Sequence, residues 1–168
     1  MTTPARSPRP FADALDATAR AALWIAGAAL VVMAVVEFWQ VFARYVLNDS
    51  PSWTEPVALL AMKWAMMLGA SAGVRADAHF GFFILVQQAR PALRRVLVAF
   101  SRLVVFATGA LLGGWGVVLT VDGWAVPMAG ASLPEGAGYL PVAVGGALIA
   151  LFAAGALAGH GRAPDRGD

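Results

Sequence analysis

Two ionisable side chains, Glu37 and Lys63, stand alone inside two long apolar stretches of the sequence. Each is the one charge in its stretch, residues 21–43 for Glu37 and residues 56–74 for Lys63. An ionisable group inside a membrane span is costly and needs a partner. In an antiparallel hairpin both residues would lie about 13 Å below the same membrane face. We therefore predict a Glu37–Lys63 ion pair that fixes the register of the hairpin, or contacts from both residues to a partner subunit.

The connection between these stretches, ARYVLNDSPSWTEP (residues 43–56), is polar and holds several residue types that form binding sites. The same residues also suit a turn between two helices. Ser52 or Thr54 could cap the second helix with its side-chain oxygen, because free N–H groups at a helix start need acceptors. We predict a structural turn, with contact to a partner as the alternative; the residues singled out for the turn or such an interface are Arg44, Tyr45, Trp53 and Glu55.

The composition predicts that Glu37, Lys63 and the turn residues are carried by helices that cross a membrane. Hydrophobic residues make up 60% of the 168 residues, charged residues make up 13%, and mean hydropathy is +0.70. A soluble domain carries about 25% charged residues. No segment alternates apolar and polar residues, so a β-barrel is disfavoured. We predict an all-α integral membrane protein with four transmembrane helices, spanning about 21–46, 54–74, 96–121 and 137–159.

The distribution of basic residues predicts how these helices are oriented. Ten arginines precede the first span, lie between the second and third, or follow the fourth, whereas the two other connections hold only Arg44. Basic residues accumulate on the cytoplasmic side of membrane proteins. Both termini are thus expected in the cytoplasm and residues 43–56 outside. The same distribution makes nucleic acid an unsuitable explanation for the pI of 9.7.

Residues at the cytoplasmic side are predicted to contact lipid rather than to catalyse a reaction. The chain has no cysteine, and its two histidines, His79 and His160, fall at helix edges, so no histidine pair exists within the bundle to ligate haem. We expect no enzymatic activity, no metal and no cofactor. The residues expected to contact phospholipid headgroups or a partner are Arg75, His79, Arg94, Arg95 and Arg102.

The remaining segments complete the predicted organisation. Residues 1–12 and 161–168 are expected to be cytoplasmic tails around a single membrane domain, residues 13–160. The aromatic segment 80–85 predicts a short amphipathic stretch in the cytoplasmic interface, and Pro91 predicts the start of the third helix. Gly109 and Gly113 have the spacing of a helix-packing motif, which we attribute to chance in so glycine-rich a chain.

Four motifs in order along the chain resemble the small membrane subunit of TRAP (tripartite ATP-independent periplasmic) transporters. These are FARYVLNDSPSWTEP, LGASAGVRADAHF, RPALRR and SLPEGAGYLPVAVGG, which together span about residues 41–146. Two positions depart from the family pattern. Pro56 stands where a second acidic residue is common, and Ala143 stands where a second proline is frequent. The first departure argues against a role that needs two carboxylates at the turn.

The resemblance implies a function that the residues alone do not. In this family a four-helix small subunit binds and braces a large multi-spanning permease subunit, which holds the substrate and sodium sites. A periplasmic binding protein delivers an organic acid, such as a dicarboxylate or sialic acid. The resemblance thus implies sodium-coupled uptake across a bacterial inner membrane.

Two other classes of protein are alternatives. A self-contained four-helix proton-coupled exporter of the small multidrug type would also carry a glutamate in its first span, here Glu37. Such proteins are shorter and often have little bias in the placement of basic residues. A membrane-bound redox or enzyme subunit is disfavoured by the missing cysteines and paired histidines.

Overall fold

Four long helices make up most of the chain in the computed structural model, which describes residues 10–76 and 91–158. Each is long and apolar enough to cross a membrane, and the all-α prediction is confirmed. The elements are α1 (Pro10–Phe42), continued by the π-helical turn η1 (Ala43–Leu47), then α2 (Thr54–Arg75), α4 (Pro91–Asp122), the 3₁₀ turn η2 (Glu135–Gly138) and α5 (Leu140–Leu157).

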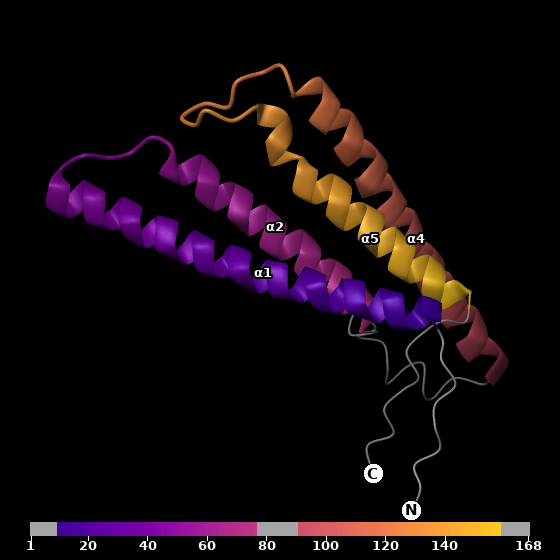
Figure 1. Ribbon diagram of the computed structural model, residues 1–168. Coiled ribbons are helices and arrows are strands. Elements are labelled where there is room, and N and C mark those ends of the chain that lie inside the picture. Colours follow the sequence, from indigo (N-terminus) through magenta and orange to yellow (C-terminus); the bar gives the residue numbers. More distant parts are fainter. Residues whose placement is uncertain (1–9, 77–90, 159–168) are drawn as a thin grey trace, which may run out of the picture.

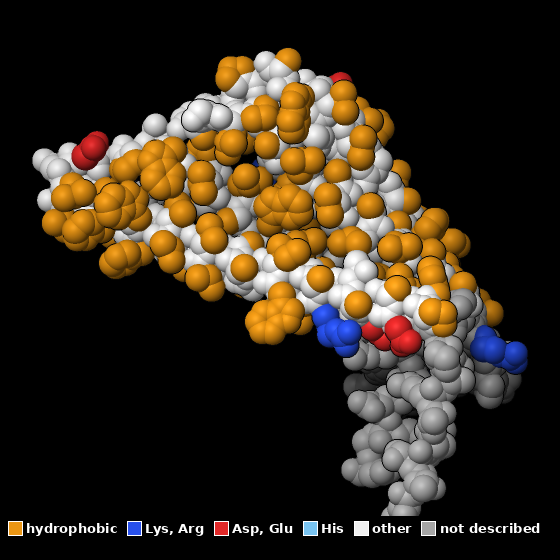
Figure 2. Space-filling view, viewed as in Figure 1, with side chains coloured by type: hydrophobic (Ala, Val, Ile, Leu, Met, Phe, Trp, Pro, Cys, Tyr) orange, Lys and Arg blue, Asp and Glu red, His pale blue; other side chains and the backbone are white. Residues whose placement is uncertain are grey.

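The helices form two hairpins, α1–α2 and α4–α5, which meet where α2 packs against α5 (Figure 1). They fan out from the end at which α1 begins and α5 ends, which we call the terminal end. The opposite end carries the connections 48–53 and 123–134, and we call it the loop end. On the face shown in Figure 2, apolar side chains cover the helices along most of their length, and the prominent basic side chains gather at the terminal end.

The four long helices overlap the four predicted spans. The third helix begins at Pro91 as expected. The first helix begins at Pro10, so residues 10–12, assigned from sequence to the tail, are helical. His79, His160 and the segment 80–85 lie outside the described residues.

Close backbone contact joins α4 to α5. A Cβ atom at Gly109 would lie 2.6 Å from the Ala150 backbone nitrogen, and one at Gly116 would lie 2.5 Å from the Ala143 nitrogen. Gly113 likewise faces α5, at 3.0 Å from the nitrogen of Ala147. Without side chains at these positions the two backbones can approach closely. The attribution of the Gly109/Gly113 spacing to chance was therefore wrong.

The α5 helix is the most buried of the four spans and contacts all three others. Its Gly145 faces Met67 of α2, and its Gly155 faces Leu15 of α1. Phe152, which is 1% exposed, joins Leu15 in a core cluster at the terminal end. The centre of the bundle is therefore the fourth span of the chain.

The register of the first hairpin leaves the end of α1 without a neighbour from α2. Asp16 of α1 is paired with Arg75 of α2. Counting from that pair, Glu37 is 21 residues along α1, and Thr54, where α2 starts, is 21 residues back along α2. The α1 helix then continues through residues 38–47, about 15 Å beyond that level at 1.5 Å per residue. Figure 1 shows this end of α1 reaching past the start of α2.

The glycine contacts of α4 predict a difference between two neighbouring single-methyl substitutions. Gly116→Ala should lower the free energy of unfolding by about 1–3 kcal/mol, because its methyl group would overlap the α5 backbone. Gly114→Ala is the matched control, since nothing lies within 4 Å of the position of its Cβ. Titration of each purified variant with SDS measures the difference. Equal stability of the two variants would contradict the proposed backbone contact.

Candidate functional site

The Lys63 ammonium group is held by the second hairpin. Its Nζ donates a hydrogen bond of 3.4 Å to the carbonyl oxygen of Gly138 and lies 5.7 Å from the centroid of the Tyr139 ring. A carbonyl dipole and the negative face of an aromatic ring both stabilise a cation. Lys63 thereby links α2 to the turn that precedes α5.

The predicted direct ion pair between Glu37 and Lys63 is therefore wrong within this chain. Counting from the connecting turn places both residues at one depth. In the register set by Asp16 and Arg75, Lys63 lies level with about Ala28, nine residues before Glu37. That separation is about 13 Å along the helix. Contact of both residues with a partner subunit stays a prediction.

The Glu37 side chain is exposed on α1, at the level where α2 begins. Exposed apolar residues adjoin it in sequence, among them Val35, Phe38 and Val41. Among the described residues the one ion pair is that of Asp16 and Arg75, so none of them neutralises Glu37. Within residues 10–76 and 91–158 the Glu37 carboxylate therefore has no cationic partner.

An ion pair that sequence reasoning missed joins the two helices of the first hairpin at the terminal end. Arg75 Nε donates to Asp16 Oδ1 at 2.9 Å, and Arg75 Nη2 donates to the carbonyl oxygen of Ala12 at 3.3 Å. The Arg75 side chain is 3% exposed and Asp16 is 30% exposed. The predicted contact of Arg75 with lipid headgroups is therefore wrong. Treating Asp16 as part of the first helix, opposite the end of the second, would have indicated the pair.

Arg102 also turns inward. Its Nη1 donates a 2.8 Å hydrogen bond to the carbonyl oxygen of Ala156, in the last turn of α5. The last carbonyl groups of a helix lack partners within it and attract cations. Arg102 is half-buried in this contact, and its contact with a headgroup or a partner stays a prediction. Arg94 and Arg95 are exposed at the start of α4.

The polar segment 43–56 joins the first two helices, as predicted, but neither Ser52 nor Thr54 caps the start of α2. The α2 helix starts at Thr54 with Glu55 in its first turn, as expected. No side chain caps that start. Thr54 Oγ1 donates to the carbonyl oxygen of Pro51 at 2.8 Å, and Ser52 Oγ donates to that of Gly130 at 3.2 Å. Ser52 thus connects the two loops.

The four turn residues singled out from sequence lie on two separate parts of the loop end. Arg44 and Tyr45 belong to η1, beyond the level at which α2 starts, and Tyr45 is 79% exposed. Trp53 and Glu55 are exposed at the beginning of α2. The structure does not join the four residues into one site, and all four are accessible.

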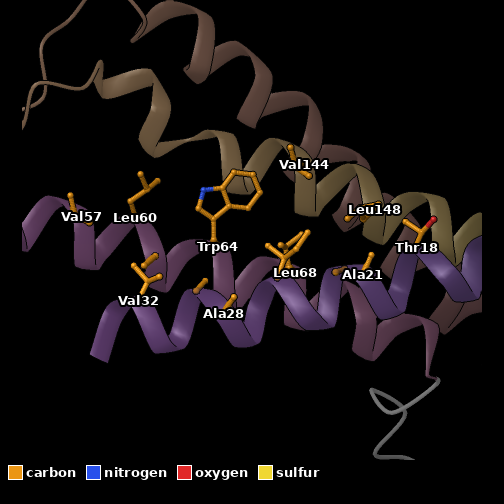
Figure 3. A pocket seen from close by; sticks show the side chains of 14 residues that line it. Thr18, Ala21, Ala28, Val32, Val57, Leu60, Trp64, Leu68, Val144 and Leu148 are labelled. Atoms are coloured by element: carbon orange, nitrogen blue, oxygen red, sulfur yellow. The ribbon is translucent and has the colours of Figure 1, made fainter. Parts of the chain in front are cut away.

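An apolar groove of about 600 Å³ runs between the hairpins. Figure 3 shows Trp64 of α2 at its centre, with Ala28 and Val32 of α1 on one side and Val144 and Leu148 of α5 on the other. Thr18, at one end, is the one polar residue among those that line it. Such a lining can hold hydrocarbon and offers no group for chemistry. Among residues 10–76 and 91–158 no cluster of three or more His, Cys, Asp or Glu residues could hold a metal ion.

Comparison with known proteins gives two matches. The sequence profile of the family described as "Tripartite ATP-independent periplasmic transporters, DctQ component" matches residues 32–162. The C4-dicarboxylate TRAP transporter small permease protein DctQ of Vibrio cholerae serotype O1 (strain ATCC 39315 / El Tor Inaba N16961) is 32% identical over 85 residues. That alignment covers 49% of this chain and 37% of the relative, so it spans little more than a third of the relative's length.

The buried ion pair predicts unequal effects of two aspartate substitutions in α1. Asp16→Ala should lower the free energy of unfolding by about 3 kcal/mol, because it removes the carboxylate that Arg75 Nε binds while the Arg75 side chain stays buried. Asp13→Ala is the matched control, since Asp13 is exposed one turn earlier. Adding Arg75→Met to Asp16→Ala should recover part of the loss in SDS titrations. A double variant no more stable than Asp16→Ala would contradict a charge effect.

Double-mutant cycles can separate the two partners considered for Lys63. Lys63→Met and Tyr139→Leu should show a coupling energy of about 0.5–2 kcal/mol, because each removes half of a cation–π contact. Lys63→Met and Glu37→Gln should be additive within about 0.5 kcal/mol, as expected for residues without a shared partner. Unfolding of the purified chain gives both values. The reverse pattern would restore the Glu37–Lys63 ion pair.

Proposed function

The chain belongs to the family of the DctQ component of tripartite ATP-independent periplasmic transporters, and from this membership we propose that it braces the large permease subunit of such a transporter. The observation that carries the proposal is the match over residues 32–162, which includes α2, α4, α5 and most of the exposed end of α1. Substrate translocation and sodium coupling are assigned to the large subunit. The chain itself supplies a membrane scaffold.

The properties of the helices support a scaffold rather than a transport pathway. Three basic side chains lie inside the spans or at their ends. Lys63 and Arg102 donate hydrogen bonds to backbone carbonyl groups, and Arg75 is paired with Asp16. These contacts connect helices to each other. The groove between the hairpins is apolar, whereas a path for an organic acid would need polar groups that replace water around the carboxylate. The family match favours this interpretation over a self-contained exporter.

The substrate we propose is an organic acid delivered by a periplasmic binding protein. The relative from Vibrio cholerae is named for C4-dicarboxylates, so these acids are the first to test. We place the chain in a bacterial inner membrane with both termini in the cytoplasm, on the distribution of its arginines. The loop end would then face the periplasm. There the exposed Arg44, Tyr45, Trp53 and Glu55 are accessible to the large subunit or to the docked binding protein.

Purification and transport assays together test this function. The tagged chain, isolated from its native membrane, should bring with it one much larger multi-spanning protein. Proteoliposomes with both proteins should take up labelled C4-dicarboxylate or another organic acid, with a sodium gradient and the binding protein present. Those with the large protein alone should be strongly impaired, because its brace is missing. Transport by this chain alone, or its isolation without a large partner, would overturn the proposal.

A further inference from the structure

The two hairpins are packed against each other near the terminal end and in the middle of the bundle. Near the terminal end, Leu15 of α1 and Phe152 of α5 share a buried apolar cluster. Near the middle, Leu148 of α5 packs against a second cluster, which contains Leu68 of α2. Closely packed apolar side chains resist rearrangement. These two core clusters therefore fix the hairpins relative to each other over this part of their length.

Polar contacts join the hairpins at the loop end. Ser52 Oγ donates to the Gly130 carbonyl oxygen at 3.2 Å, and Lys63 Nζ donates to that of Gly138 at 3.4 Å. The Lys63 ammonium group also lies 5.7 Å from the centroid of the Tyr139 ring. Each contact joins a residue of the first hairpin to a residue of the second. We call these five residues the clasp.

The loop of the second hairpin is shaped to bring Gly130 against Ser52. Gly130 has a φ of +82°, a left-handed conformation that favours glycine, and a Cβ atom there would lie 2.6 Å from the Ser52 carbonyl oxygen. The backbone of the loop is bonded to itself, since the Met128 N–H donates to the Leu133 carbonyl oxygen at 2.8 Å. The contact at Gly130 is thus determined by the backbones of both loops.

The hairpins diverge between the core clusters and the loop end. Figure 1 shows the helices fanning apart in this direction. The apolar groove lies in the space between them, with Val32 of α1 and Val144 of α5 on opposite sides (Figure 3). These two side chains are 47% and 39% exposed, so α1 and α5 are not packed against each other at this level. The angle between the hairpins here depends on α2 and the loops, whose contacts include the clasp.

The contacts of the clasp are weak enough to open while each hairpin stays folded. Its hydrogen bonds, at 3.2 and 3.4 Å, lie at or beyond the upper limit of usual hydrogen-bond lengths. The cation–π contact of Lys63 adds a modest attraction. Opening would nevertheless leave the Lys63 ammonium group inside a span without these partners, which is unfavourable. The closed arrangement is therefore the favoured one.

We propose that the clasp is a conformational device: it sets the angle between the two hairpins, which pivot about the core clusters when the clasp is released. Rotation of rigid units about an interface is a common form of conformational change. The width of the apolar groove changes with this angle, because the hairpins form its two sides. The pivot is a property of the chain by itself and does not rest on the proposed function.

Distances between spin labels measure the angle in the full chain, reconstituted in lipid nanodiscs. The chain has no native cysteine, so introduced cysteines carry labels at chosen sites alone. Glu55→Cys with Asp122→Cys reports on the loop end, and Ala17→Cys with Ala99→Cys reports on the terminal end. All four residues are exposed. Double electron–electron resonance gives the distance distribution of each pair.

Removal of the clasp side chains should change the distances at one end only. Lys63→Met combined with Ser52→Ala should shift the loop-end distances to longer values and broaden their distribution, while the terminal-end distances stay as they are. Lys63→Arg should keep the native distances, because a guanidinium group also donates to a carbonyl oxygen and stacks on the Tyr139 ring. Met62→Leu is the matched control, since Met62 adjoins Lys63 and is 43% exposed.

Two results would overturn the proposal. Unchanged loop-end distances in the double variant would mean that helix packing alone fixes the angle. Changes at both ends would mean that the core clusters do not act as the pivot. If the double variant does not fold, Lys63→Met and Ser52→Ala are measured singly, and each should give a smaller loop-end shift in the same direction. Native distances in both single variants would then reject the clasp.

Discussion

In a membrane interior a polar group without water must find its partner within protein, and this requirement organises the structure. Three basic side chains each have a partner within the protein. Arg75 pairs with a carboxylate of the preceding helix, Lys63 lies between a carbonyl group and an aromatic ring, and Arg102 binds the last turn of α5. Each contact joins two elements, so the groups that are most costly to bury also define how the helices meet.

The helices between these contacts divide into a centre and two flanks. The α5 helix is small-residue rich and packs against its neighbours through glycine, whereas α1 and α4 expose most of their apolar side chains. This division suits a subunit whose outer helices are meant to be covered.

The spans, the start of α2 at Thr54 and the start of α4 at Pro91 could be predicted from sequence because they follow from local properties, namely hydropathy and helix-start residues. The register of the first hairpin could not. It depends on how far α1 continues past α2, which contacts distant in sequence decide, above all that of Asp16 with Arg75. The same holds for Gly109 and Gly113, whose spacing is common by chance and gains meaning only from the α5 backbone beside it. Hence the elements were predicted well, and the pairing of Glu37 with Lys63 was not.

The central position of α5 also determines the order in which the bundle can be completed. A ribosome releases α1 and α2 first, and their hairpin can close through Asp16 and Arg75 before the rest of the chain exists. Lys63 must wait, because Gly138 and Tyr139 are synthesised about 75 residues later. During that interval its ammonium group sits in the membrane without its partners. The arrival of the fourth span therefore both completes the centre of the bundle and supplies the partners of the Lys63 ammonium group.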